Sequence, residues 1–187
     1  CGTGALAFAL APHVKEVVGV DPRTDYLEAG RRIAPPNVRL EEGDVMGLPF
    51  GYAEFDLACC HRVLHHVRLP ALAVSELARV TRPGGRILIA DQLGSVDPLV
   101  SLEMDRFERL RDPSHQRLLP DADIRGFLDA NDLVVLASEV VRERVDLERR
   151  LELAGFDDAE RARIRGPGSA EPYEVEVGWY VARKPGV

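Results

Sequence analysis

The stretch Cys1-Gly2-Thr3-Gly4-Ala5-Leu6-Ala7 decides the fold, because it places a Gly-x-Gly-x-x-Gly/Ala pattern at the start of an expected helix. Glycines at such a turn let the backbone bend tightly and let a ligand approach the helix N-terminus. The pattern alone is weak, but Asp21 stands 19 residues after Gly2, at the end of an apolar run. A carboxylate there can accept both hydroxyls of a ribose. An aspartate before Pro22 also suits a surface turn, yet the combination predicts a nucleoside-containing cofactor.

Stretches with helical and with strand periodicity alternate along the chain, which is typical of an α/β sheet with crossover helices. The patterns predict strands at 17–21, 38–44, 55–60, 86–91, 133–141 and 174–182, and helices at 3–12, 24–33, 69–80, 97–111, 121–130 and within 146–165, with a loop at 166–169. We expect residues 1–187 to form a single domain. The segment 93–119 follows the carboxyl end of a strand, so it is either a lid over a pocket or an insert carrying an ordinary surface helix.

Composition excludes several classes of function. The chain of 187 residues has 24 basic and 31 acidic side chains, a net charge of −7, which disfavours binding to phosphate backbones. No apolar run reaches the roughly 20 residues needed to cross a bilayer. The three cysteines, Cys1, Cys59 and Cys60, make no disulfide framework and fit a reducing compartment. We therefore expect a cytoplasmic protein that acts on a small molecule, without nucleic-acid or membrane partners.

A nicotinamide dinucleotide and S-adenosylmethionine are both compatible with this arrangement of Gly2, Gly4 and Asp21. At the end of the strand expected at 38–44, Asp44 places a carboxylate where it can pair with the exocyclic amine of adenine, and Val45 can flank the ring. A capping role for Asp44 is the alternative. Tyr180 and Lys184 have the Tyr-x-x-x-Lys spacing of short-chain dehydrogenases, but they fall on an expected strand, where four residues span roughly 13 Å. A nicotinamide enzyme would therefore lack a credible catalytic pair.

Five blocks of sequence carry a resemblance to a known family. They are Cys1-Gly2-Thr3-Gly4, Gly19-Val20-Asp21, Gly43-Asp44-Val45 with Leu48-Pro49-Phe50, Phe55-Asp56, and Arg82-Pro83-Gly84-Gly85. In this order the chain resembles class I S-adenosylmethionine-dependent methyltransferases, and most of all the methyltransferase type 11 branch, which includes relatives of the ubiquinone/menaquinone C-methyltransferases. The resemblance implies a Rossmann-like, doubly wound, mostly parallel sheet whose last strand, 174–182, is antiparallel.

The resemblance also implies roles for individual residues. The cofactor-binding residues it implies are Cys1, Gly2, Thr3 and Gly4 beneath the methionine part, Asp21 and Pro22 at the ribose, Asp44 and Val45 at adenine, and Cys60 and His61 near the transferable methyl group. The family has a further strand before the glycines, lying between the strands at 16–21 and 55–60. This sequence does not contain it, so we expect the domain to be N-terminally truncated and the fragment alone to fold poorly.

An oxygen or carbon acceptor can also need a general base. Histidine suits proton transfer near neutral pH, and His61, His65, His66 and His115 follow the relevant strands. Helix capping or gap filling explains His65 and His66 equally well, and an exposed, idle position explains His115. We take His115 and His65 as the candidate catalytic residues. His61 and His65 have the spacing of a helical metal pair, but the expected geometry at His61 is not helical, and no metal site is predicted.

These observations predict transfer of a methyl group from S-adenosylmethionine to an O, N or C atom of a small molecule, by an enzyme that could be a homodimer. Two alternatives stay open. One is a nicotinamide-dependent oxidoreductase, and the other is a protein that binds S-adenosylmethionine without turnover.

Overall fold

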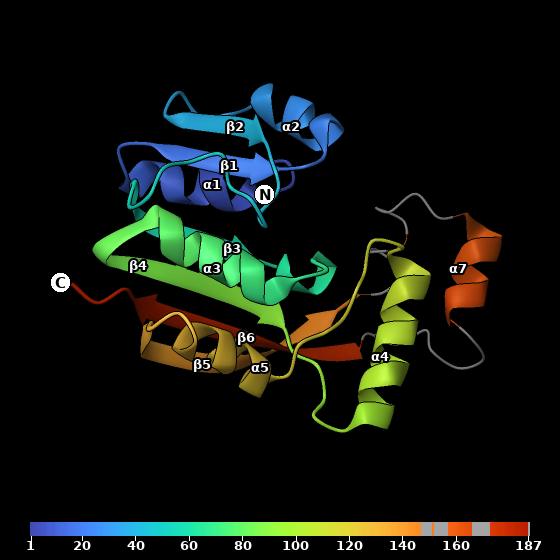
Figure 1. The fold of residues 1–187 in the computed structure, drawn as a ribbon. Helices are drawn as coiled ribbons and strands as arrows, with labels where there is room; N and C mark the ends of the chain where they lie inside the picture. Colours follow the sequence, from blue (N-terminus) through green and yellow to red (C-terminus); the bar gives the residue numbers. More distant parts are fainter. Residues whose placement is uncertain (147–150, 152–156, 166–172, 187) are drawn as a thin grey trace.

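The structure is a computed structural model, and it describes residues 1–146, 151, 157–165 and 173–186. The elements are α1 (Ala5–Leu10), β1 (Val17–Asp21), α2 (Thr24–Arg31), β2 (Val38–Glu42), β3 (Phe55–His61), α3 (Pro70–Val80), β4 (Thr81–Gln92), α4 (Pro98–Arg111), α5 (Asp121–Asp129), β5 (Val134–Val145), α7 (Asp158–Arg165) and β6 (Tyr173–Arg183). Two short 3-10 helices lie between these elements: η1 (Ala11–His13) connects α1 to β1, and η2 (Leu64–His66) connects β3 to α3. Strands and helices alternate along most of the chain, except that β3 follows β2 and α5 follows α4 directly (Figure 1).

The strands form two hydrogen-bonded sheets. In the first, β1 pairs in parallel with β2; in the second, the order is β3-β4-β6-β5. Strand β4 is parallel to β3, whereas β6 is antiparallel to both of its neighbours, β4 and β5. This confirms the predicted α/β architecture with an antiparallel last strand. No ladder joins β1 to β3 within the part of the chain that the structure describes.

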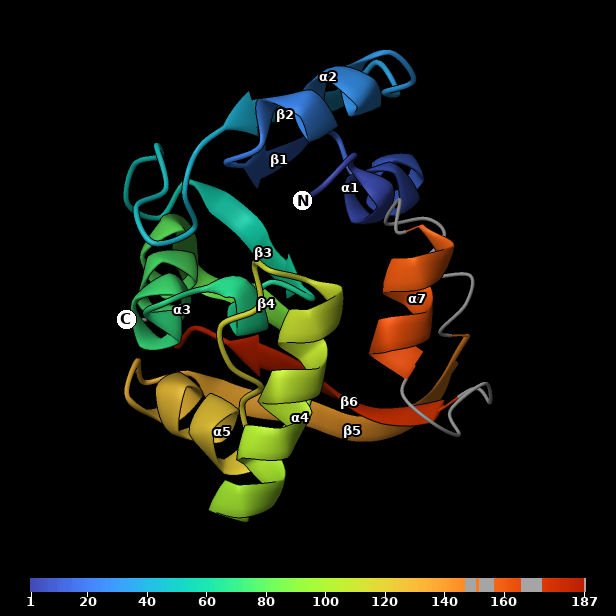
Figure 2. The ribbon, with the colours of Figure 1, turned by 90° about the vertical axis from the view of Figure 1, so that its right-hand side faces the viewer.

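Helices α3 and α5 cover one face of the four-stranded sheet, and α1 and α7 lie on the other side (Figure 2). The main core is built between that sheet and α3 and α5, and it includes Ile87, Ile89, Leu77, Leu128 and Tyr180, all nearly without solvent contact. A smaller core holds α1 and α2 against the β1–β2 sheet. A third apolar cluster, with Phe107 and Tyr173 in contact with Ile164, joins α4 to α7.

The element boundaries differ from the predicted ones in a few places. Strand β2 ends at Glu42 rather than at 44, because the Asp44 carboxylate accepts the Met46 amide hydrogen in a turn. Strand β4 begins at Thr81, since Thr81 pairs with Phe55 across an irregularity in the ladder. Strand β5 runs on to Val145. Of the helix expected within 146–165, residues 158–165 form α7, while 147–150 and 152–156, like the loop expected at 166–169, lie outside the described residues.

No helix among the described residues is both long enough and apolar enough to span a bilayer.

Candidate functional site

The glycine turn before α1 has the conformation that its sequence requires. Gly2 and Gly4 have φ angles of 57° and 97°, and the Gly4 amide donates to the Cys1 carbonyl at 3.0 Å. Residues that carry a side chain rarely adopt such positive φ angles, so glycine is needed at both positions. A Cβ added at Gly2 would meet no atom within 4 Å, which leaves this side of the turn open to a ligand.

The rest of the turn is packed against α2. A Cβ added at Gly30 would overlap the carbonyl oxygen of Thr3 and would lie 2.6 Å from Cδ1 of Leu40. Gly30 therefore lets the second helix approach the backbone of the turn directly. This close approach fixes the position of Thr3 and, through it, the opening next to Gly2.

Asp21, at the end of β1, is tied to the glycine turn. Its Oδ2 accepts hydrogen bonds from the charged amino group of Cys1 and from the Gly2 amide, each at 2.7 Å, and its Oδ1 accepts from the Arg23 amide at 3.0 Å. Partial burial alone would raise the pKa of Asp21, but these hydrogen bonds and the positive charge of the Cys1 amino group outweigh it and hold the pKa below its usual value. An ionised carboxylate has about four acceptor sites, so three bonds leave about one for a ligand in this conformation. Pro22 follows on the surface.

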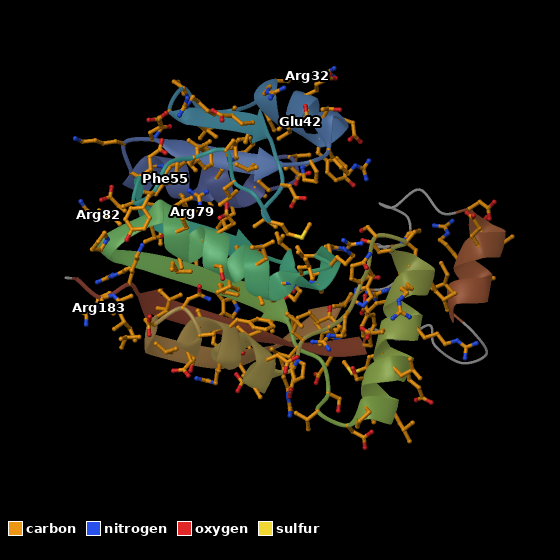
Figure 3. The ribbon with its side chains drawn as sticks, viewed as in Figure 1. Arg32, Glu42, Phe55, Arg79, Arg82 and Arg183 are labelled. Carbon is orange, nitrogen blue, oxygen red and sulfur yellow. The ribbon has the colours of Figure 1, made fainter. Side chains whose placement is uncertain are left out.

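The loop that carries Asp44 leaves β2 beside Asp21, because the Gly43 amide donates to the Asp21 carbonyl at 3.2 Å. The loop that carries Asp44 is held by α3 (Figure 3). Arg79 donates to the carbonyl oxygens of Leu48 and Phe50, at 3.0 and 2.7 Å, and Glu76 accepts the Leu48 amide. The hydrogen bond from Arg79 lowers the pKa of Glu76.

Within this loop, Asp44 is exposed, whereas Val45 packs against the main core. The expected cofactor residues of the first two turns are thus brought to one edge: Cys1, Gly2, Thr3, Gly4, Asp21, Pro22, Asp44 and Val45. Their contacts with a cofactor stay predictions.

At the end of β3, Cys60 and His61 lie on opposite faces of the sheet, although both were predicted to lie near the transferable methyl group. The Cys60 thiol is buried in the main core, which raises its pKa, so only its backbone is available to a ligand. His61 lies on the other face of the sheet, with its ring 5.6 Å from that of Trp179. Burial, helped by the charge of Arg62, lowers the pKa of His61.

Arg62 has a φ of 53°, a left-handed conformation that is costly for a side chain of this size. Its amide donates to the Ala90 carbonyl at 2.8 Å, and its guanidinium forms an ion pair with Glu143 of β5. The strained residue thus turns the chain sharply from β3 into η2, where the next two histidines lie.

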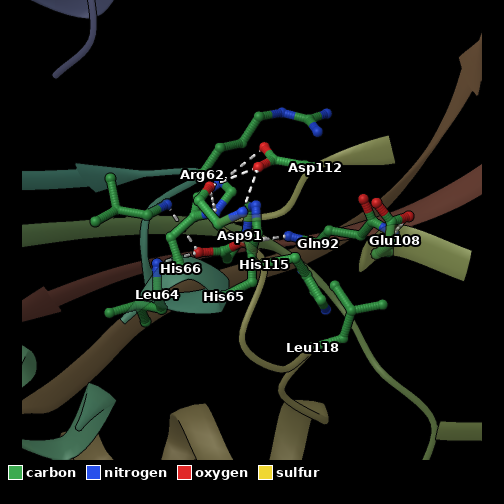
Figure 4. Close-up of polar contacts among 12 residues, drawn as sticks. Arg62, Leu64, His65, His66, Asp91, Gln92, Glu108, Asp112, His115 and Leu118 are labelled. Carbon is green, nitrogen blue, oxygen red and sulfur yellow. Dashed lines mark hydrogen bonds and ion pairs between the residues drawn. The ribbon is translucent and has the colours of Figure 1, made fainter. Parts of the chain in front are cut away.

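Three histidines gather at the carboxyl ends of β3 and β4 (Figure 4). The ring centroid of His65 lies 4.0 Å from that of His66 and 5.7 Å from that of His115. The sequence placed His65 and His115 as candidates from separate segments, and the structure brings them together. His61 is not part of this cluster.

Each of the three rings has its own acidic partner, directly or through a hydroxyl. Nδ1 of His65 is hydrogen-bonded to Asp91, and Nε2 of His115 lies 2.8 Å from Oδ1 of Asp105. The third ring uses a relay: Oγ of Ser114 lies 3.0 Å from Nδ1 of His66 and donates to Oδ1 of Asp112 at 2.6 Å. Burial and the neighbouring His65 lower the pKa of His66.

The inward face of α4 is charged, although the sequence predicted only an ordinary surface helix or a lid in this segment. Its buried residues are Asp105, Glu108 and Arg111. Glu108 accepts from Nε2 of Gln92 at 3.0 Å and pairs with Arg111. The following segment is fastened to η2, since the amides of Gln116 and Arg117 donate to the His65 carbonyl at 2.9 and 3.2 Å.

Sequence reasoning missed Asp91 and Asp105. Asp91 did have a signal, because it ends an expected parallel strand, the edge where α/β proteins place functional side chains. Asp105 lies in the middle of a helix with mixed charges and gave none. Among the described residues no group of three histidine, cysteine or acidic side chains has the arrangement of a metal site.

The Tyr180/Lys184 pair has other uses in the fold. The buried Tyr180 hydroxyl donates to Asp121 at 2.6 Å, and Nζ of Lys184 donates to the carbonyls of Ala78 and Thr81, each at 2.8 Å. Neither group lies with the histidines, so the spacing typical of dehydrogenases has a purely structural explanation here.

Comparison with known proteins agrees with this geometry. Residues 1–89 match the model of the family described as methyltransferase domain. The chain is 35% identical to YcgJ of Bacillus subtilis, an uncharacterised methyltransferase, over 136 residues, which are 71% of this chain and 54% of that protein. It is also 35% identical to the demethylmenaquinone methyltransferase of Clavibacter sepedonicus over 120 residues, 63% of this chain and 49% of that protein.

The crystal structure of YcgJ superposes with a TM-score of 0.84 at 25% identity, covering 100% of this chain and 89% of the YcgJ chain. The chain spans about half the length of the curated relatives that it matches. Residues 1–89 therefore match the methyltransferase domain family, and the chain has the Rossmann-like fold of class I S-adenosylmethionine-dependent methyltransferases.

Proposed function

We propose that the protein transfers a methyl group from S-adenosylmethionine to an O, N or C atom of a small molecule. The observation that carries the proposal is the glycine turn tied to Asp21, inside the segment that matches the methyltransferase family. The open side of Gly2 and the remaining acceptor site of Asp21 suit the methionine and ribose parts of this cofactor. The exposed carboxylate of Asp44 suits its adenine amine.

When bound, S-adenosylmethionine supplies a methyl carbon activated by a positively charged sulfur. The acceptor atom forms its bond to that carbon as the carbon–sulfur bond breaks, and the electron pair stays on sulfur. The protein's main task is to align the two groups, which can contribute up to about 7–11 kcal/mol to rate acceleration. The glycine turn and Asp21 hold one partner, and the end of β3 with the segment 112–119 forms the other side.

An oxygen or carbon acceptor must also lose a proton. Of the two candidate bases, His65 is the better placed, because its side chain is 11% exposed while that of His115 is 1% exposed. We therefore propose His65 as the base. His115, bonded to Asp105 and set against His65, supports it from the side of α4. Segment 93–119, which carries α4 and this histidine, is proposed as the lid.

Incubation with methyl-labelled S-adenosylmethionine and an extract of small metabolites tests the proposal. We expect label in a metabolite, and less of it after His65→Gln. Tight binding of S-adenosylmethionine without any labelled product would favour a non-catalytic binding protein. Binding of NADH in place of S-adenosylmethionine would favour the oxidoreductase.

We further propose a cytoplasmic homodimer that does not bind nucleic acid. The cysteines Cys1, Cys59 and Cys60 are unpaired, which suits a reducing compartment, and the charge of −7 disfavours polyanions. Cell fractionation tests the compartment.

The homodimer is supported by β5, which is an end strand of its sheet and whose side chains Val134, Leu136 and Val140 are nearly half exposed. Light scattering should give twice the mass of one chain, whereas the mass of a monomer would contradict the dimer.

A further inference from the structure

Asp91 occupies a position that the proposed chemistry has not yet used. It stands at the carboxyl end of β4, is 1% exposed, and pairs with Gly178 across the sheet. Its two oxygens accept four hydrogen bonds. Oδ2 accepts from the amides of Val63 and Leu64, at 3.1 and 2.7 Å. Oδ1 accepts from the Gln92 amide at 2.8 Å and is bonded to Nδ1 of His65.

Four donors fill the roughly four acceptor sites of a carboxylate. The carboxylate has no hydrogen to give, so Nδ1 of His65 must be the donor in their hydrogen bond. A neutral imidazole carries only one N–H, and the lone pair must then be on Nε2. Nε2 makes no hydrogen bond with any residue that the structure describes. His115 is held the opposite way round, through its Nε2.

From this geometry we propose that Asp91 is a positioning residue, which keeps the hydrogen of His65 on Nδ1 so that Nε2 accepts the proton of the methyl acceptor. The inference rests on the proposed function. In the step itself, the proton leaves the acceptor atom for Nε2 as the new bond to the methyl carbon forms. His65 then carries two hydrogens and one positive charge, which the buried carboxylate of Asp91 stabilises.

The same carboxylate shapes the loop that carries His65. By accepting the amides of Val63 and Leu64, it fixes the turn into η2 directly after the strained Arg62. The other titratable groups around the ring are His66 from η2, with Asp112 behind it, and His115, with Asp105 behind it. Of all these acidic groups, Asp91 alone is bonded to the His65 ring.

The structure predicts how Asp91→Asn should act. If the asparagine oxygen took the place of Oδ1, its NH2 group would face two amide hydrogens, those of Val63 and Leu64. With the amide turned round, NH2 faces only the Gln92 amide hydrogen and donates to Nδ1 of His65. The second arrangement has fewer donor–donor conflicts, and it forces the hydrogen of neutral His65 onto Nε2, which removes the base.

Nitrogen-15 NMR of the full chain with labelled histidine measures this directly, with the His65 signals assigned by their loss in His65→Gln. We expect neutral His65 to carry its hydrogen on Nδ1 in the wild type and in the control Asp112→Asn, and on Nε2 in Asp91→Asn. An Nε2–H form in the wild type, or an unchanged tautomer in folded Asp91→Asn, would overturn the inference. If Asp91→Asn does not fold, the wild-type tautomer decides alone.

Calorimetry with S-adenosylmethionine on the same samples separates the two proposals. If the wild type binds S-adenosylmethionine but its neutral His65 carries the hydrogen on Nε2, only the role of Asp91 is refuted. Absence of binding in the folded wild type refutes the proposed function, whatever the tautomer.

Discussion

Gly30 and Gly126 offer one substitution with opposite expected effects. Both lie in helices, Gly30 in α2 and Gly126 in α5. In Gly30→Ala the new methyl group would overlap the Thr3 carbonyl oxygen and lie 2.6 Å from Leu40 and 2.9 Å from the Thr3 carbonyl carbon. Two of these atoms belong to the backbone, so no rotation of a side chain relieves the overlap. In Gly126→Ala the methyl group meets nothing within 4 Å.

The expected free energies follow from these contacts. Overpacking of a fixed site costs about 1–3 kcal/mol, and alanine in a helix regains about 1 kcal/mol relative to glycine. Because the overlap at Gly30 is with the backbone, we take the upper end of the overpacking range, about 3 kcal/mol. After the gain of about 1 kcal/mol from alanine in a helix, Gly30→Ala should lower the free energy of unfolding by about 2 kcal/mol. Gly126→Ala should raise it by about 1 kcal/mol. At roughly 2–4 °C per kcal/mol, Tm should fall by about 4–8 °C and rise by about 2–4 °C, respectively.

Urea unfolding gives both free energies, and calorimetry gives the affinity for S-adenosylmethionine. Because Gly30→Ala displaces Thr3 in the glycine turn, it should also weaken cofactor binding, whereas Gly126→Ala should leave binding unchanged. Equal effects of the two substitutions on stability, or a Gly30→Ala variant as stable as the wild type, would refute the packing argument.

Three further predictions concern other parts of the fold. Tyr180→Phe removes a 2.6 Å hydrogen bond to the Asp121 carboxylate and keeps the buried ring, so urea unfolding should show a loss of about 1.5 kcal/mol; no loss would mean that the bond adds nothing. The pKa of His66 is lower in the folded state than its value of about 6.5 in the unfolded chain. When the pH falls below about 6.5, the unfolded chain therefore binds more protons than the folded one. The contribution of His66 to stability is complete above that pH and is lost as pH falls through the folded pKa. The urea midpoint of the wild type should therefore drop more between pH 7.5 and 5.5 than that of His66→Gln, and equal drops would contradict this. Finally, β1 and β3 have no ladder between them among the described residues, and we propose that a parallel strand preceding Cys1 joins them. Residues 1–187 alone should then melt at a lower temperature than a chain extended upstream, and amides on the facing edges of β1 and β3 should gain protection from hydrogen exchange in the longer chain. Identical melting would argue against the strand.

Much of the fold could be predicted because its signals are local. Apolar runs and turns set the order of strands and helices, and the alternation in 174–182 marked a strand that proved antiparallel. Boundaries failed where a contact from elsewhere decided them. Arg82-Pro83-Gly84-Gly85 has the composition of a turn, yet these residues lie within β4, which starts at Thr81 where it pairs with Phe55.

The candidate site divides in the same way. Gly2 and Asp21 could be paired from the sequence, because the glycine pattern and the end of the next strand have a known spacing. The link between His65 and Asp91 could not, since 26 residues and a whole helix separate them and only the parallel pairing of β3 with β4 brings them together. The charged inner face of α4 was hidden for another reason: its partners, Gln92 and His115, come from segments on either side of the helix.

The central claim is that the glycine turn and Asp21 form a site for S-adenosylmethionine. Isothermal calorimetry of the wild type and of Asp21→Ala, with S-adenosylmethionine, its demethylated product and NADH as ligands, tests it most directly. Loss of the carboxylate removes the ribose contact and releases the Gly2 amide, so we expect wild-type binding of the two sulfur compounds to weaken at least tenfold, about 1.4 kcal/mol, in the variant. NADH should not bind. Binding of NADH but not of S-adenosylmethionine, or equal affinity of the wild type and Asp21→Ala for S-adenosylmethionine, would contradict the claim.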